Sequence, residues 1–293
     1  MITVEQWRER GQTFRFNGHD IFYVREGEGA PLVCIHGFPT ASWDFAKLWP
    51  ELTARFDVVA PDMLGYGLSA KPRGHQYCIA EQVDLHVALL EHLGITECHV
   101  LCHDYGDTVG QEWMARHKDG VRSKSDDAAP QLRSVTLLNG GLFPETHRAL
   151  LIQKLMLSPL GPWVARLSSQ RLFDRSLVNV FGPNTPPSRQ ELDAFWWLAT
   201  REDGRRTFPG MIRYMVERKE HRERWVGALA QDLPWQVING SLDPISGAHM
   251  VDRLIELYPA ANVVRLPHVG HYPHVEDPDA VLQAFLAFVG KHS

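Results

Sequence analysis

The chain has 293 residues, of which 44% are hydrophobic and 22% are charged, and its formal net charge is −5. These proportions are those of a globular protein with a large core, and they exclude a disordered or collagen-like chain. The acidic balance argues against a surface for nucleic acid or anionic lipid, and the sequence has no run of about 18 apolar residues that would predict a membrane span.

The opening residues, MITVEQWRERGQTF, lack the apolar core of a signal peptide, so we expect a cytoplasmic protein. Next come two alternating runs, QTFRFNG and DIFYVREG, which predict a pair of strands. Four β-rich apolar runs follow: PLVCIHG, FDVVAPD, ECHVLCHD and LRSVTLLNG. Helical patterns separate them, namely SWDFAKLWPELTARF, IAEQVDLHVALLEHLG and the stretch after Asp104. Strands that are apolar on both faces and separated by helices predict a mostly parallel sheet covered on both sides.

The alternation of strands and helices stops near residue 142. Residues 143–232 have helical patterns, contain many tryptophans and are broken by proline and glycine. The alternation resumes with LPWQVING and ends in a helix, DPDAVLQAFLAFVGKH. We therefore expect an α/β core made of residues 1–142 and 233–293, with a helical cap (143–232) inserted after the sixth strand. Residues 118–130 are polar and predict a surface loop.

The four cysteines, Cys34, Cys78, Cys98 and Cys102, form no C-x-x-C pair. Three of them lie in apolar strand-like or turn contexts, which favours reduced, packed thiols over disulfides or a metal site. We expect neither a metal nor an organic cofactor.

Asp104 lies where a predicted strand meets a predicted helix, within the run Cys102-His103-Asp104-Tyr105-Gly106. A small-x-nucleophile-x-small turn at the carboxyl end of a strand is the pattern of a nucleophile elbow. A carboxylate is already ionised at neutral pH, so it can attack a carbon that bears a leaving group and form an alkyl ester. The alternative is a structural aspartate that caps the helix. No G-x-S-x-G run occurs, which argues against a serine hydrolase.

Residues 36–39, HGFP, end the third predicted strand. In such a loop the N–H of Phe38, together with that of Tyr105, forms an oxyanion hole, which suits the intermediate made when water attacks the ester. The alternative is a plain turn at the end of a strand. The Phe38–Pro39 bond is a candidate cis peptide.

Two further strand ends complete the set. GSLDPIS places Asp243 after one strand, and LPHVGHYPHVEDP places His271 after the next. The chain order nucleophile, acid, histidine is the one expected for this arrangement, with His271 activating water and Asp243 fixing its tautomer. His271 must be neutral for that step, so we expect activity to fall as the pH drops through its pKa, nominally about 6.5. His268 and His274 are the competing histidines, and His271 is favoured over both.

A weaker motif, DMLGYGLSA, contains G-x-G-x-x-A and could be taken for a dinucleotide fingerprint. No helix begins directly behind it and Pro72 intervenes, so a structural turn is favoured.

Together HGFPT, the D-x-x-G-x-G-x-S run, HDYGD, GSLDP and GHYPHVEDP resemble the epoxide hydrolase and haloalkane dehalogenase branch of the α/β-hydrolase superfamily. NGGLFPETHR, FGPNT and RWVGAL resemble more closely the subfamily of the mesoderm-specific transcript protein and its bacterial relatives. The resemblance implies an eight-stranded, mostly parallel sheet with a helical cap. It also implies that Asp104 is the nucleophile, His271 the base and Asp243 its charge partner, with oxyanion amides from Phe38 and Tyr105.

Epoxide hydrolases also use cap tyrosines that protonate the epoxide oxygen. Tyr214 is the only tyrosine between residues 142 and 232 and resembles the second of these, while the first is missing and His147 is a candidate substitute. We therefore expect an epoxide hydrolase that acts on a small apolar epoxide and water.

A haloalkane dehalogenase is the alternative activity. It is less favoured because Tyr105 follows the nucleophile where such enzymes typically have tryptophan, and Phe38 stands where they often have asparagine. The sequence also places no arginine beside the nucleophile, as fluoroacetate-type enzymes require. A non-catalytic protein that keeps the fold is the third possibility.

Overall fold

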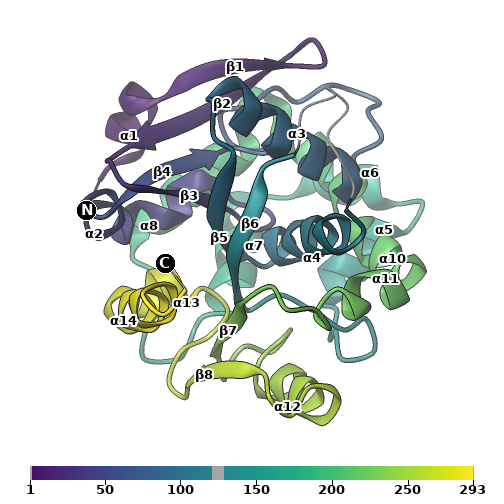
Figure 1. The fold of residues 1–293 in the computed structure, drawn as a ribbon. Coiled ribbons are helices and arrows are strands. Elements are labelled where there is room, and N and C mark those ends of the chain that lie inside the picture. Colours follow the sequence, from purple (N-terminus) through teal and green to yellow (C-terminus); the bar gives the residue numbers. More distant parts are fainter. Residues whose placement is uncertain (1, 121–128, 293) are drawn as a thin grey trace.

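The computed structural model describes residues 2–120 and 129–292 and contains one eight-stranded sheet (Figure 1). The strand order is β1-β2-β4-β3-β5-β6-β7-β8. The first two pairings, β1 with β2 and β2 with β4, are antiparallel, and the other five are parallel. The predicted strand pair and the mostly parallel sheet are both confirmed. The strands are β1 (Gln12–Phe16), β2 (His19–Glu26), β3 (Ala30–Ile35), β4 (Phe56–Pro61), β5 (Glu97–His103), β6 (Gln131–Leu138), β7 (Trp235–Gly240) and β8 (Asn262–Leu266).

Each face of the sheet has its own apolar core. In β3, Val33 and Ile35 belong to one core, whereas Leu32 and Cys34 belong to the other, as expected for a strand whose side chains alternate. The first core includes buried residues of α3 (Ile79–His92), α4 (Tyr105–Lys118) and α12 (Ala248–Leu257). The second includes residues of α1 (Val4–Arg10), the 3-10 helix η1 (Ser42–Lys47), α2 (Trp49–Thr53), α13 (Pro273–Glu276) and α14 (Pro278–Val289). The sheet is therefore the middle layer of three (Figure 1).

Two local elements differ from the sequence-based expectation. The helix expected from residue 42 onward is divided into η1 and α2, and Pro50 lies in the first turn of the second. Helix α1 was not predicted. Thr3 and Gln6 form a capping box at its start, and Trp7 is fully buried, with its indole N–H donating to Ser42 Oγ at 3.1 Å.

Between β6 and β7 the described chain is helical and contains no strand. Its elements are α5 (Leu151–Leu157), α6 (Gly161–Leu167), α7 (Gln170–Val178), α8 (Arg189–Thr200), the 3-10 helix η2 (Arg201–Thr207), α9 (Phe208–Met211), α10 (Tyr214–Glu220) and α11 (Arg222–Gly227). Pro162 and Pro209 lie in first turns, where proline begins a helix rather than breaking one. Of the predicted loop 118–130, residues 121–128 lie outside the described residues.

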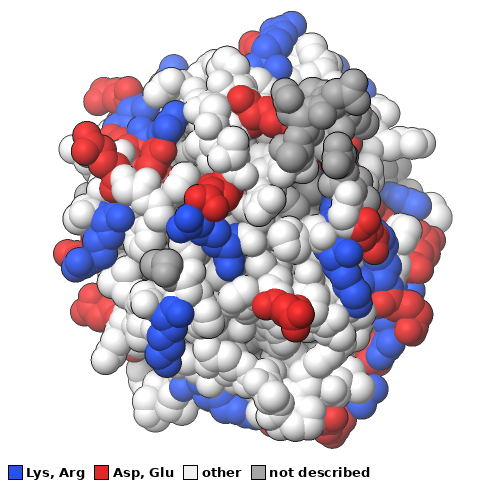
Figure 2. Space-filling model, in the orientation of Figure 1, with Lys and Arg blue, Asp and Glu red and all other residues white. Residues whose placement is uncertain are grey.

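The four cysteines are free, and Cys34, Cys98 and Cys102 are buried, in agreement with the sequence. Among the described residues, no helix is both long and apolar enough to cross a membrane. The face seen in Figure 2 carries acidic and basic side chains interspersed, mostly toward its rim.

Candidate active site

Asp104 occupies a sharp turn between β5 and α4, as the sequence predicts. Its backbone has φ 49° and ψ −105°, a conformation that L-residues rarely adopt and that the surrounding structure must impose. The turn lies against β3, because a Cβ atom on Gly106 would approach the carbonyl oxygen of Ile35 to 2.3 Å. Glycine at this position is therefore a packing requirement.

The two oxygens of the Asp104 carboxylate have different environments. Oδ2 accepts a hydrogen bond from the N–H of Phe38 at 3.0 Å, and the N–H of Tyr105 also donates to the carboxylate. The Phe38 loop is fixed by His36, whose Nδ1 donates to the carbonyl of Gly37 at 2.9 Å and whose Nε2 accepts from the N–H of Met63 at 3.0 Å. The Phe38–Pro39 peptide is cis, as anticipated. The two amides expected to form an oxyanion hole therefore already converge on this carboxylate.

The second oxygen, Oδ1, faces His271. The Nε2 of His271 lies 3.7 Å from Asp104 Oδ1, and its Nδ1 lies 2.8 Å from Oδ2 of Asp243. All three residues are at most 5% exposed. The three residues expected from the ends of β5, β7 and β8 thus form one continuous line.

Asp243 is held by several donors. Its Oδ1 accepts from the N–H of Ile245 at 2.7 Å, and its Oδ2 accepts from Ser246 Oγ at 2.9 Å and Asn139 Nδ2 at 3.0 Å. With His271, these contacts satisfy the carboxylate on every side and fix its orientation.

Asp107 supports the same region from α4. It lies in the first turn of the helix, and its carboxylate accepts from the N–H of Leu138 at 3.1 Å and of Gly140 at 2.7 Å. These bonds fix the backbone on either side of Asn139. The side chain of Asn139 then donates to Asp243. The dipeptide Asn139-Gly140 after a strand was the available signal for this turn.

The three residues shift one another's pKa values. Burial favours neutral His271, but the charge and hydrogen bond of Asp243 and the charge of Asp104 outweigh it and raise the pKa of His271 to about 9. Burial also disfavours ionised Asp243, yet His271 and the hydrogen-bond donors lower the pKa of Asp243 overall. Burial raises the pKa of Asp104, against the charges of His271 and Arg218 and the two amides. His271 is therefore protonated in the free protein at neutral pH, and the nominal pKa of about 6.5 expected from the sequence is too low.

Helix α10 brings Tyr214 to the same site. Tyr214 is buried, and its ring centroid lies 4.9 Å from that of Tyr105. Burial, and after it the charge of Asp104, raises the pKa of the Tyr214 hydroxyl. His147 is also close to this site, since the charges of Asp243 and His271 act on it, while burial and Arg218 lower the pKa of His147 to about 3. The charge of Asp104 thus acts on Tyr214, and the charges of Asp243 and His271 act on His147.

Arg218 was missed, because it lies in a charged run that predicts a solvated helix face. It is only 2% exposed and follows Tyr214 by four residues, on the same face of α10. Its Nη2 donates to Thr108 Oγ1 at 2.8 Å, and its guanidinium carbon lies 4.7 Å from the centroid of the Tyr214 ring.

Residues 30–278 match the family model described as alpha/beta hydrolase fold. The chain belongs to this family. It is 40% identical over 301 aligned positions to the mesoderm-specific transcript protein of Mus musculus, covering 98% of this chain and 88% of that protein. The subfamily resemblance read from the sequence is thereby confirmed.

Among solved structures, this α/β-hydrolase is similar to the haloalkane dehalogenase DatA from Agrobacterium tumefaciens C58 (TM-score 0.79, 18% identity, 97% of each chain covered). It is similar also to a putative epoxide hydrolase from Pseudomonas aeruginosa (TM-score 0.79, 19% identity, 96% of this chain and 95% of that one). At such identities these likenesses establish the fold.

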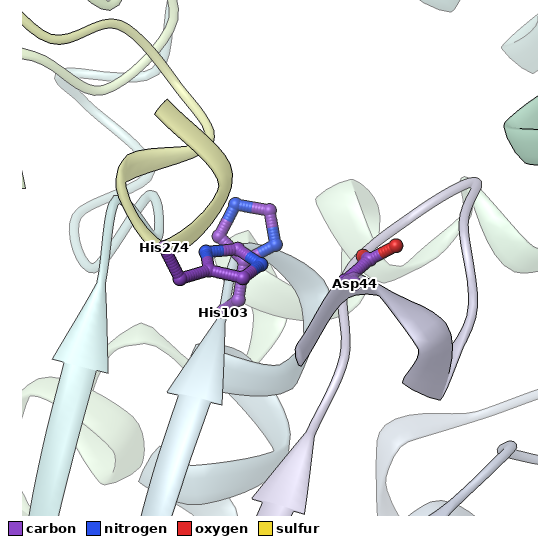
Figure 3. A group of neighbouring side chains, drawn as sticks. All are labelled: Asp44, His103 and His274. Atoms are coloured by element: carbon purple, nitrogen blue, oxygen red, sulfur yellow. The ribbon is translucent and has the colours of Figure 1, made fainter. Parts of the chain in front are cut away.

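The α/β-hydrolase contains a second polar cluster behind the turn, made of Asp44, His103 and His274 (Figure 3). Figure 3 shows His103 and His274 with their imidazole rings side by side, and the ring centroids are 4.5 Å apart. Asp44 approaches from η1, and one ligand-type atom of each residue lies within 4.8 Å of the others. His274, the competing histidine, belongs to this cluster, and His268 is exposed.

The Asp44–His103–His274 cluster has few internal partners. His103 Nε2 donates to the carbonyl of His271 at 2.8 Å, but its Nδ1, both ring nitrogens of His274 and Oδ1 of Asp44 find no hydrogen-bond partner in the described part of the chain. Two imidazoles and a carboxylate are ligands that divalent transition metals accept. Metal binding requires an ionised carboxylate, whereas burial raises the pKa of Asp44 well above its usual value. We assign no metal to the cluster.

Proposed function

We propose that this α/β-hydrolase is an epoxide hydrolase that converts a small apolar epoxide and water into a vicinal diol through an ester on Asp104. One observation carries the proposal: two amides hold the Asp104 carboxylate, with Phe38 on Oδ2, while Oδ1 faces the His271–Asp243 pair. The helical segment 143–232 acts as a cap that brings Tyr214 to the substrate.

In the first step, Oδ1 of Asp104 attacks an epoxide carbon and the carbon–oxygen bond of the ring breaks. The electron pair passes to the epoxide oxygen, which takes the proton of the Tyr214 hydroxyl. The products of this step are a hydroxyalkyl ester on Asp104 and a phenolate on Tyr214. A tyrosine near the nucleophile supports epoxide opening because the developing alkoxide needs a proton.

In the second step, His271 must become neutral. Ester formation removes the charge of Asp104, which is one of the causes that raise the pKa of His271 to about 9. The imidazolium can then return a proton to the Tyr214 phenolate. Neutral His271 next takes a proton from water as the water attacks the ester carbon, and Oδ2 becomes the oxyanion, already held by the amide of Phe38. Collapse releases the diol and restores the Asp104 carboxylate and protonated His271.

A haloalkane dehalogenase could use the same nucleophile and base. Such an enzyme must also stabilise the departing halide. The donor is typically the indole of a tryptophan directly after the nucleophile, and this chain has Tyr105 at that position. The donors proposed for this site are instead the hydroxyl of Tyr214 and the imidazole of His147. Such donors suit the oxygen of an opening epoxide better than a halide.

Intact-mass spectrometry of His271→Gln tests the proposal, because this variant should form the ester without releasing it. The variant is incubated with a panel of apolar epoxides and, separately, with a panel of haloalkanes. Asp104→Ala/His271→Gln is the matched control. An adduct that equals the whole epoxide and is absent from the control supports the proposal. An adduct equal to a haloalkane less its hydrogen halide, without an epoxide adduct, favours the dehalogenase. No adduct from either panel contradicts both activities and favours a non-catalytic protein.

A further inference from the structure

Arg218 has an unusual environment for a buried guanidinium. Buried arginines are normally paired with carboxylates, since an uncompensated charge in the interior is costly. Within the described residues, no carboxylate lies within 4.0 Å of the Arg218 nitrogens. Its hydrogen bonds go to the neutral groups Thr108 and His147, and its guanidinium also lies against the ring of Tyr214. This cation therefore contacts both cap residues near Asp104.

The contact with His147 determines which ring nitrogen of that imidazole carries the proton. Nη1 of Arg218 lies 3.4 Å from Nδ1 of His147, and arginine can only donate. The low pKa of His147, about 3, keeps the ring neutral at physiological pH. Its single proton is therefore on Nε2, because Nδ1 must accept.

The Nε2–H group of His147 is buried and finds no hydrogen-bond partner in the part of the chain that the structure describes. A buried donor without a partner is unfavourable unless an acceptor from outside the chain binds it. The guanidinium of Arg218 therefore contacts the imidazole of His147 through Nη1 and the ring of Tyr214 through its face.

The backbone makes room for this arrangement. A Cβ atom on Gly141 would lie 2.3 Å from Nη1 of Arg218 and 3.1 Å from Nδ1 of His147. A larger residue at position 141 would therefore require the guanidinium of Arg218 to move. The hydrogen bond from Nη2 to Thr108 Oγ1 anchors the other side of the guanidinium to α4, one turn beyond Asp104.

We infer that Arg218 is a positioning residue that presents His147 Nε2–H and Tyr214 O–H together to the oxygen of the opening epoxide. The inference rests on the proposed function. His147 donates a hydrogen bond and keeps its proton, whereas Tyr214 transfers its own. As the carbon–oxygen bond breaks, negative charge leaves Asp104 and ends on the Tyr214 phenolate, beside the Arg218 guanidinium. The pair thus replaces the two tyrosines expected from the resemblance.

A competing role for Arg218 is long-range charge compensation, because its charge lowers the pKa of both Asp104 and Asp107. The two roles predict different behaviour for Arg218→Lys. A lysine keeps the positive charge, but its single ammonium group cannot replace the planar guanidinium, which donates to Thr108 and His147 at once. Compensation alone predicts that Arg218→Lys behaves as the native chain, whereas positioning predicts that it resembles Arg218→Gln.

The first readout is the tautomer of His147, measured on the native chain by nitrogen-15 NMR of the imidazole groups. The signal is assigned by its loss in His147→Gln. We expect protonated Nε2 and unprotonated Nδ1 in the native chain and a mixture of tautomers in Arg218→Gln. A proton on Nδ1 in the native chain overturns the inference. This readout needs no substrate, so it distinguishes failure of the inference from failure of the proposed function.

The second readout is the rate of ester formation in the His271→Gln background, followed by intact mass. Adding Arg218→Gln should slow ester formation by about 10²-fold, as for loss of a preorganised donor. With Arg218→Lys in place of Arg218→Gln, the rate should recover less than about a tenth of what Arg218→Gln loses. Arg213→Gln, an exposed neighbour, is the matched control and should react at the unmodified rate. Thr108→Val is a milder variant that removes one anchor, for use if Arg218→Gln does not fold, and it should slow the same step by about 10-fold. Ester formation at the unmodified rate in Arg218→Gln or in Arg218→Lys overturns the inference.

Discussion

Two buried clusters of aspartate and histidine adjoin the turn at Asp104, and the pKa values of their histidines are shifted in opposite directions. The line Asp104–His271–Asp243 contains an ionic pair, because the pKa of His271 is raised to about 9 and that of Asp243 is lowered. In the Asp44–His103–His274 cluster, burial lowers the pKa of His274 to about 3 and raises that of Asp44, so burial favours the neutral form of both groups. All of these residues are at most 5% exposed, so the extent of burial is not the difference.

The difference lies in hydrogen bonding. His271 has a carboxylate at 2.8 Å, and that carboxylate is itself held by several donors. His274 lies only three residues further along the chain, but neither of its ring nitrogens has a partner among the residues described. In this interior an opposite charge and oriented donors favour the charged form of a group, and their absence favours the neutral form. The following predictions test that contrast.

The largest effect is expected from Asp104→Asn, which removes one charge from the ionic line. The amide cannot act as the nucleophile, so ester formation should fall by about 10⁵-fold. The same variant should be at least as stable as the native chain, because a buried carboxyl with a raised pKa disfavours folding at neutral pH. Rapid-quench kinetics and urea denaturation provide the two measurements. A destabilised Asp104→Asn would show that the contacts of this carboxylate outweigh its desolvation.

The next largest effect is expected from Asp243→Asn, which removes the partner that keeps His271 charged. The pKa of His271 should fall from about 9, since Asp243 is the first of the groups that raise it. Ester hydrolysis should slow by about 10³- to 10⁴-fold, because the imidazole loses its tautomeric control. An NMR titration of His271 gives the pKa and accumulation of the ester gives the rate. A midpoint that stays near pH 9 would assign the shift to Asp104 instead.

A smaller effect is expected from His274→Phe, in the neutral cluster. Folded His274 stays neutral down to a pKa of about 3, whereas the unfolded chain binds a proton at about 6.5, so this residue makes the protein less stable as the pH falls below 6.5. Between pH 6.5 and pH 5 the loss is about 2 kcal/mol for one histidine. Phenylalanine preserves the stacking on Phe45, whose ring centroid lies 5.1 Å away, and should remove that loss. Urea denaturation at pH 7 and pH 5 compares the two chains. An identical pH dependence would contradict the neutral assignment.

The smallest effect is expected from Asp44→Asn. A neutral carboxyl and an amide have similar shape, and Thr40 can still donate to the side-chain oxygen. The free energy of unfolding should change by less than about 1 kcal/mol and the rate of turnover by less than about threefold. Asp243→Asn, measured in parallel, is the matched comparison. An equal loss in both variants would mean that Asp44 is ionised.

Much of this architecture could be read from the sequence because it depends on local patterns. Short apolar runs separated by helical periods give the parallel sheet, and small residues around Asp104 give the turn. His271 and Asp243 follow strands whose carboxyl ends must meet at one edge of the sheet, so their proximity to Asp104 follows from topology.

The remaining features depend on contacts between distant segments. Arg218 lies in a run, RYMVERKEHRERW, that predicts a solvated helix, yet it is buried and contacts Thr108 of α4 and His147 of the segment after β6. The raised pKa of His271 could not be predicted from the sequence either. A sequence shows which groups titrate, but it does not show the 2.8 Å contact with Asp243 that helps to raise this pKa to about 9.

The hydrogen bond from the amide of Phe38 should also keep the two oxygens of the Asp104 carboxylate distinct from one turnover to the next. In the proposed reaction, Oδ1 of Asp104 leaves in the diol and an oxygen from water takes its place, while Phe38 retains Oδ2 and prevents the carboxylate from rotating. In ¹⁸O-labelled water, the first diol that each molecule releases should therefore contain no label, and the second should be fully labelled. A carboxylate free to rotate would label only half of the second diol. Sequential single turnovers analysed by mass spectrometry would thus report whether one backbone hydrogen bond persists through a catalytic cycle.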